Sequence, residues 1–331
     1  MSTSTAPVFI FDTDMGNDVD DLLAQILLIR RLARTGGEFG AAVVNKGNRL
    51  APAFVDLINR LHGYPDVPVG WCPHGPSPQE GAACEAAFLR PVLGEAGVGV
   101  LDYDPDTKEW PDAVHVLRRT LAAAADGSVV YISIGFATVL AGLLDSGPDD
   151  VSPLDGRELL RSKVRFVSAM AGEFAHLQGD GPPHLEHNIV GDIASAARIC
   201  AGLPVPIVFS GFEVGNRFCF PGRELHRAFA DDPARILSRS YELYCGFDHD
   251  RPLWDLTTVL QAIAPEEGYF DLSPPGTVTV AADGATHFAP HEGGLHRYLK
   301  VNAGKHREIM DLFVGDCLAR EERRTLVDAT T

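Results

Sequence analysis

The fold of this 331-residue chain is decided by the segment VFIFDTDMGNDVDD, at positions 8–21. It begins with the apolar run Val8-Phe9-Ile10-Phe11, which has the length and composition of a buried strand. A cluster of carboxylates follows, and from Val19 to Leu32 leucine and isoleucine recur at helical spacing. The segment therefore predicts a strand, an acidic loop and a helix whose acidic first turn suits the helix dipole.

The same succession recurs along the chain. Apolar runs lie at 40–44, 128–132, 164–167 and 206–209, each followed by small or polar residues, and helical patterns lie near 51–61, 137–144 and 305–318. Alternating strands and helices indicate the α/β class, with a mostly parallel central sheet flanked by helices in a Rossmann-like arrangement. No clear linker divides the chain, so we expect one domain over residues 1–331. Ligands of such sheets bind beyond the carboxyl ends of the strands, where the polar clusters fall.

The composition limits the classes of partner. The formal net charge of −17 repels phosphates and anionic lipids, so neither a nucleic acid polymer nor a membrane is expected as a partner. The six cysteines are scattered without a C-x-x-C pair, which indicates neither zinc nor a disulfide framework. No apolar run reaches the roughly 18 residues of a membrane span, and the first residues lack a signal-peptide pattern. We expect a soluble, reduced, cytoplasmic protein.

The acidic loop is the strongest functional signal. Positions 12–21 hold five carboxylates: Asp12, Asp14, Asp18, Asp20 and Asp21. Like charges this close repel one another, and a bound cation removes the conflict. A helix cap needs only one or two acids. Oxygen ligands favour calcium or magnesium over zinc, and Gly16 lets the backbone turn sharply close to the ion.

The pattern D-T-D-x-G-x-D-x-D-D, between an apolar strand and an apolar helix, resembles the nucleoside hydrolases, which are the inosine/uridine-preferring and purine-specific nucleosidases. Their usual motif is D-x-D-x-G-x-D-D, so this chain has two extra residues before the final pair. The resemblance implies the nucleoside hydrolase architecture. It also implies Ca²⁺-dependent hydrolysis of the N-glycosidic bond of a ribonucleoside, or of a modified nucleoside, to ribose and free base. A homodimer or homotetramer is expected from the same resemblance.

The resemblance also implies roles for the carboxylates of the motif. Asp14 matches the residue that binds calcium and is the proposed general base. Asp21 matches a calcium ligand, and Asp20 matches the residue that contacts the ribose hydroxyls. Asp12 is expected to support the site.

Further segments match the family in the same order along the chain. Asn45, with Asn48 as the alternative, matches an Asn near the ribose. Thr138, in I-G-F-A-T, matches a Thr whose backbone carbonyl binds calcium. The other matches are Met170 in M-A-G, Glu186 and Asn188 in E-H-N-I at the ribose, and Asp255 as the last calcium ligand.

Departure of the base also requires stabilisation of the leaving group. Cleavage of the C1′–N bond builds positive charge on the sugar, and a metal, a carboxylate base and contacts to the sugar hydroxyls assist it. Many pyrimidine-tolerant members of the family place a His before the last Asp, where this chain has Trp254. Purine-specific members stack the base between aromatic rings, so Trp254 is the candidate for this step, with Trp71 or Phe212 as its partner. The choice between purine and pyrimidine stays open.

Two alternatives remain at this stage. One is a nucleoside-binding protein that keeps the metal site without activity, and the missing His favours it. The other is a phosphatase of the haloacid dehalogenase type, which also places D-x-D after a strand. The segment Met15-Gly16-Asn17 departs from the phosphatase pattern, which also leaves Asp20-Asp21 and the ribose segment unexplained.

Overall fold

The first strand, β1 (Val8–Thr13), occupies an interior position of a sheet in the computed structural model, which describes residues 6–77, 85–175, 182–231 and 235–319. It pairs in parallel with β2 (Glu38–Val44) on one side and β4 (Val129–Ser133) on the other. The sheet continues past β2 to β3 (Val69–Trp71). Past β4 it continues, all in parallel, through β5 (Val164–Met170), β6 (Ile207–Ser210) and β12 (His296–Val301). The predicted α/β class with a mostly parallel sheet is confirmed.

The C-terminal edge of the sheet was not predicted from the sequence. There β10 (Gly276–Val280) pairs antiparallel with β11 (Thr286–Pro290) and with β12, and β9 (Phe270–Leu272) also pairs with β12. The signal was present, because T-V-T-V alternates in the manner of a half-buried strand and Asp283-Gly284 is a hairpin turn pair. A small second sheet joins β7 (Cys219–Phe220) to β8 (Arg251–Pro252).

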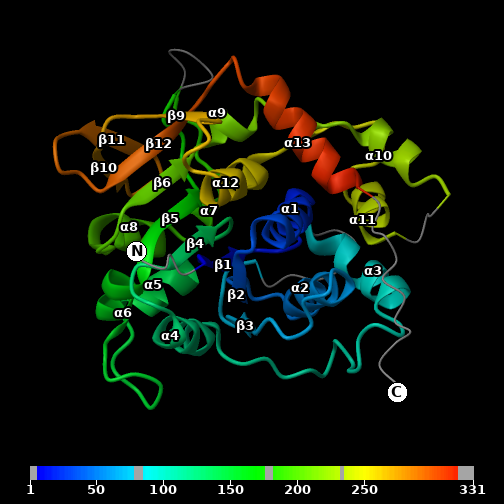
Figure 1. Ribbon diagram of the computed structural model, residues 1–331, viewed down its shortest axis with the longest axis horizontal. Helices are drawn as coiled ribbons and strands as arrows, with labels where there is room; N and C mark the ends of the chain where they lie inside the picture. Colours follow the sequence, from blue (N-terminus) through cyan, green and yellow to red (C-terminus); the bar gives the residue numbers. More distant parts are fainter. Residues whose placement is uncertain (1–5, 78–84, 176–181, 232–234, 320–331) are drawn as a thin grey trace.

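Helices cover both faces of the sheet (Figure 1). The buried core of one face is built around α1 (Asp20–Thr35), α2 (Leu50–Leu61), α12 (Trp254–Ile263) and α13 (His306–Leu318). The core of the other face is built from α4 (Ala113–Ala123), α5 (Thr138–Leu144), α6 (Gly156–Lys163) and α8 (Ile193–Gly202). The other helical segments are η1 (Glu85–Phe88), α3 (Leu89–Ala96), α7 (His187–Gly191), α9 (Phe212–Gly215), α10 (Gly222–Ala228) and α11 (Ile236–Tyr244).

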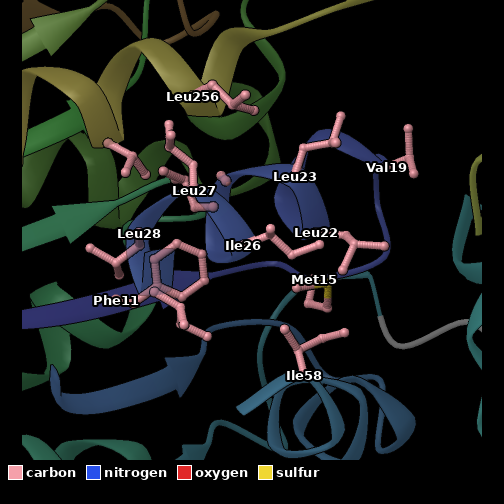
Figure 2. Close-up of a cluster of buried hydrophobic side chains, with 14 of the residues drawn as sticks. Phe11, Met15, Val19, Leu22, Leu23, Ile26, Leu27, Leu28, Ile58 and Leu256 are labelled. Atoms are coloured by element: carbon pink, nitrogen blue, oxygen red, sulfur yellow. The ribbon is translucent and has the colours of Figure 1, made fainter. Parts of the chain in front are cut away.

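The first helix is buried on nearly all sides. Its apolar residues meet Ile58 of α2 and Leu256 of α12, with Phe11 of β1 beneath them (Figure 2). A helix enclosed in this way has little freedom to shift, so the acidic turn at its N-terminus is held in place by packing. None of the helices in the described part of the chain is long and apolar enough to cross a membrane.

Candidate active site

A pocket of about 260 Å³ opens where the acidic loop after β1 meets the start of α12. Segments from both ends of the chain meet there, because α1 packs against α12. Its lining contains both polar and aromatic side chains. The lining residues are Asp14, Asn17, Asp18, Asp20, Asp21, Ile134, Met170, His184, Glu186, His187, Asn188, Phe212, Tyr244, Arg251, Trp254 and Asp255.

Three carboxylates gather at the wall that α1 and α12 share. Oxygen atoms of Asp20, Asp21 and Asp255 lie within 4.8 Å of one another, and all three residues are buried. The backbone N–H of Asp255 donates a hydrogen bond to Asp20 at 3.2 Å, and the Thr13 hydroxyl donates to Asp21. The structure thus brings Asp20, which the resemblance assigned to the sugar, into the same cluster as the two expected calcium ligands.

A divalent cation fits this cluster. Burial raises the pKa of Asp20, Asp21 and Asp255 well above the ordinary value, and the negative charges of neighbouring carboxylates raise it further. Holding three buried carboxylates ionised so close together therefore requires positive charge between them. The donors are all oxygen atoms, the type that hard cations such as Ca²⁺ and Mg²⁺ prefer.

Asp14 lies beside the cluster and is held from the side by Asn17. The Asn17 amide donates to the Asp14 carboxylate, and the Lys46 ammonium donates to the amide oxygen of Asn17. Burial raises the pKa of Asp14, while the charges of Lys46 and His187 lower it. Asp14 therefore has one fixed oxygen partner and borders the pocket, as a proton acceptor must.

Asp12 and Asn45 form a buried hydrogen-bonded pair next to the acidic loop. Asp12 accepts hydrogen bonds from the Tyr131 hydroxyl (2.6 Å) and the Asn45 amide (2.8 Å). Burial raises the pKa of Asp12 to about 7, although these two hydrogen bonds lower it. The Asn45 oxygen in turn accepts from the backbone N–H of Phe136 at 3.1 Å. Asn45 is not among the pocket-lining residues, because both ends of its amide are used inside the fold.

The pocket is also lined by three residues that follow the sequence order of the family: Met170, Glu186 and Asn188. The Glu186 carboxylate accepts from the backbone N–H groups of Asn188 and Ile189 and so caps α7. The Asn188 amide donates to the carbonyl oxygens of Met170 (3.0 Å) and Ile134 (3.3 Å). The E-H-N-I segment thereby ties the ends of β4 and β5 together at the pocket.

Thr138 lies elsewhere. It begins α5, its hydroxyl donates to Asp192 at 2.6 Å, and it is not one of the pocket-lining residues. Its carbonyl is at the start of a helix, where carbonyl oxygens accept the helix's own hydrogen bonds. From the same segment, Ile134 lines the pocket instead, four residues earlier and directly after β4.

Trp254 is part of an aromatic wall. Its ring stacks on Phe212 with centroids 5.4 Å apart, and Phe212 stacks on His184 at 3.8 Å. The indole N–H of Trp254 donates to the carbonyl of Phe212 at 3.0 Å. Trp254 and Phe212 thus stack directly on each other, too close for a base to lie between them as the expected sandwich requires. Trp71 donates its indole N–H to the Lys46 carbonyl and does not line the pocket.

Several pocket residues were missed in the sequence. Asn17 lies inside the acidic motif, and Arg251 lies four residues before Asp255. Their closeness to these motifs in the sequence is a signal from which both could be predicted as site residues. Tyr244, at the end of α11, gave no signal, because its pocket position depends on how α11 packs.

Comparison with known proteins agrees with this geometry. The family model described as inosine-uridine preferring nucleoside hydrolase matches residues 9–308. No curated protein sequence matches the chain.

The fold is shared with solved structures of low sequence identity. A plant nucleoside hydrolase superposes with a TM-score of 0.68 at 18% identity, covering 96% of this chain and 100% of that one. The inosine-uridine preferring nucleoside hydrolase from Bacillus anthracis gives 0.66 at 18% identity, with 95% and 99% covered. The type III effector XopQ, solved with adenosine diphosphate ribose, gives 0.68 at 16% identity, with 96% and 95% covered. Since the family model spans nearly the whole chain, the protein belongs to the inosine-uridine preferring nucleoside hydrolase family, whose members are N-glycosyl hydrolases.

Proposed function

We propose that this protein is a calcium-dependent nucleosidase that hydrolyses the N-glycosidic bond of a ribonucleoside or a modified nucleoside. The observation that carries the proposal is the buried cluster of Asp20, Asp21 and Asp255, with Asp14 on the same wall. When bound there, the ion would neutralise these carboxylates, bind the sugar diol and acidify a water molecule.

The residues of this chain then have separate tasks. Asp14 accepts the proton of the attacking water, because it faces the pocket and its partner Asn17 keeps one oxygen fixed. The sugar would be positioned by three further lining residues, Met170, Glu186 and Asn188. Holding the sugar in one orientation removes much of the entropic cost of the reaction.

The ligand set is proposed with one change from the resemblance. Asp14, Asp20, Asp21 and Asp255 would supply carboxylate oxygens. The backbone oxygen from the loop after β4 would come from Ile134 rather than Thr138, because Ile134 lines the pocket and Thr138 begins a helix.

Release of ribose from a panel of nucleosides tests the activity. Wild-type protein with added Ca²⁺ is expected to release ribose, and chelation is expected to abolish the release. Asp14→Asn removes the proton acceptor and should lower kcat by at least about 100-fold. Asp112→Asn is the matched control, since Asp112 caps α4 outside the pocket and Asn caps a helix equally well. If Asp14→Asn keeps wild-type activity, Asp14 is not the base.

A nucleoside-binding protein without activity is the second candidate. It is favoured by Trp254, whose N–H is already used by Phe212 and which has no acidic proton to give a leaving base. Binding of a nucleoside by calorimetry with no ribose released over days would establish it. The solved neighbour with adenosine diphosphate ribose makes that compound a sensible addition to the binding panel. The phosphatase alternative loses its basis, because the family model matches the whole site region.

Assembly as a homodimer or homotetramer stays a prediction, which native mass measurement tests. So does the placement of the whole chain in one domain, and limited proteolysis tests that prediction.

A further inference from the structure

One cationic side chain of the pocket has no role in the scheme above. Arg251 is the only lysine or arginine among the pocket-lining residues in the described part of the chain. Its guanidinium lies over the rings of Trp254 and Tyr244, with distances of 5.2 and 5.3 Å from its central carbon to the ring centroids. The positive charge is thus placed against the aromatic side of the pocket, near the aromatic ladder of Trp254 and Phe212.

Asp18 fixes one side of this guanidinium. The Nε of Arg251 donates to both oxygens of Asp18 at 3.0 and 2.9 Å, and Nη2 forms an ion pair with the same carboxylate. Nη2 also donates to the Tyr244 hydroxyl at 3.3 Å, and that hydroxyl donates to the Asn17 carbonyl. Among the residues that the structure describes, no partner is found for Nη1. Asp18 lies in the acidic motif, which is two residues longer here than in the family's usual pattern.

The remaining nitrogen of Arg251, Nη1, can donate a hydrogen bond to a leaving base. With the sugar held, as proposed above, by the carboxylate cluster and by Glu186 and Asn188, the base would lie against the remaining lining groups, which include the aromatic rings and Arg251. Arginine has only donors and stays charged, so it binds an acceptor such as a carbonyl oxygen and offers nothing to an amino group.

Resting on the proposed function, we propose that Arg251 binds the carbonyl oxygen of an oxo-base and stabilises that base as it leaves. This contact would give the pocket the preference for inosine and uridine that the family's name describes, and would disfavour adenosine. As the C1′–N bond breaks, its electron pair moves to the base nitrogen, and the charge spreads to the carbonyl oxygen beside the guanidinium. The water oxygen bonds to C1′, Asp14 takes one proton of the water, and the base nitrogen takes a proton from solvent. The guanidinium performs electrostatically what an acid would do by proton transfer.

Arg251→Met in the full chain tests this with three substrates: inosine, adenosine and 4-nitrophenyl β-D-ribofuranoside. The nitrophenolate departs without help, whereas hypoxanthine does not. We expect kcat/KM for inosine to fall about 100-fold and that for the nitrophenyl riboside to change by less than about 3-fold. The preference for inosine over adenosine should shrink accordingly. Arg223→Met is the matched control, because Arg223 pairs with Asp248 at an exposed site outside the pocket.

A second variant removes a side effect. Arg251→Met leaves the Asp18 carboxylate without its partner, so Arg251→Met with Asp18→Asn must show the same dependence on the leaving group. Equal losses on inosine and on the nitrophenyl riboside would mean that Arg251 only braces the loop, and the proposal is overturned. Unchanged inosine kinetics overturn it as well. If Arg251→Met does not fold by circular dichroism, the double variant Arg251→Met with Asp18→Asn, which leaves no unpaired charge, takes its place in the same comparison.

Failure of the proposed function gives a different result. In that case wild-type protein releases neither ribose nor nitrophenol. The Arg251 proposal is then decided by calorimetry with free bases, in which the wild type binds hypoxanthine more tightly than adenine and Arg251→Met binds both alike. Equal affinities in the wild type overturn it.

Discussion

Gly135→Ala should displace the Asp14 carboxylate while leaving the carboxylate itself unchanged, so it tests how much activity depends on the position of Asp14. Gly135 lies in the loop between β4 and α5, directly against the acidic loop. A Cβ at this residue would lie 2.5 Å from the backbone nitrogen of Asp14 and 2.7 Å from both Asp14 Oδ1 and Asn45 Nδ2. The backbone nitrogen of Asp14 and the hydrogen-bonded amide of Asn45 have little freedom to move aside.

The magnitude follows from these distances. Ordinary contact begins near 3.4 Å, so the loop and Asp14 must separate by roughly 0.9 Å. A displacement of about 1 Å in a group that must meet its substrate costs about 100-fold in rate, and overpacking costs about 1–3 kcal/mol of folding stability. We therefore expect folded protein whose kcat falls about 100-fold, with every functional side chain still present.

Steady-state ribose release and a denaturant titration measure the two effects. Gly315→Ala is the control, since a Cβ on this residue of α13 meets nothing within 4 Å. It should keep full activity and gain about 0.5–1 kcal/mol of stability, because alanine is the better helix former. If Gly135→Ala had wild-type kcat and wild-type affinity for Ca²⁺, the argument that this close approach sets the position of Asp14 would be refuted.

Two further predictions concern pH. In chelator-treated protein, Asp20, Asp21 and Asp255 have folded pKa values raised by burial above those of the unfolded chain, so the folded state holds more protons. The free energy of unfolding should therefore fall as pH rises above the unfolded carboxyl pKa of about 4, and saturating Ca²⁺ should remove the slope; a flat profile without the ion contradicts the cluster. Burial lowers the pKa of His296 to about 4, where its Nδ1 accepts the Val278 N–H at 2.8 Å. Because the folded pKa of His296 lies below the unfolded value, up to about 3 kcal/mol of stability should be lost as pH falls from about 6.5 to 4. His296→Asn, which keeps an acceptor for the Val278 N–H, should reduce that loss in urea titrations. An unchanged pH profile of stability in this variant would contradict the role of His296.

The fold was largely predictable because its signals are local. Strands of the parallel part are covered on both faces, so each appears as a continuous apolar run followed by polar residues, as in Val8–Thr13. The antiparallel edge was missed because short, half-exposed strands such as Gly276–Val280 carry weaker patterns.

The site was predictable where residues are close in sequence and not where the fold brings them together. The motif gives Asp14, Asp20 and Asp21 at once, and all three line the pocket. Asn45, in contrast, is turned inward by Asp12, a partner on the neighbouring strand that the sequence of one loop does not reveal. The same holds for Arg251, whose partner Asp18 is 233 residues away.

The link between Asp255 and Asp20 joins residues that are 235 positions apart. During synthesis on a ribosome, α1 therefore leaves the exit tunnel long before α12 exists. Until then the acidic turn lacks its third carboxylate and the helix lacks the apolar neighbour Leu256, so a nascent chain has no complete site for a cation. Ion capture can thus come only late in biogenesis, after most of the polypeptide has been made.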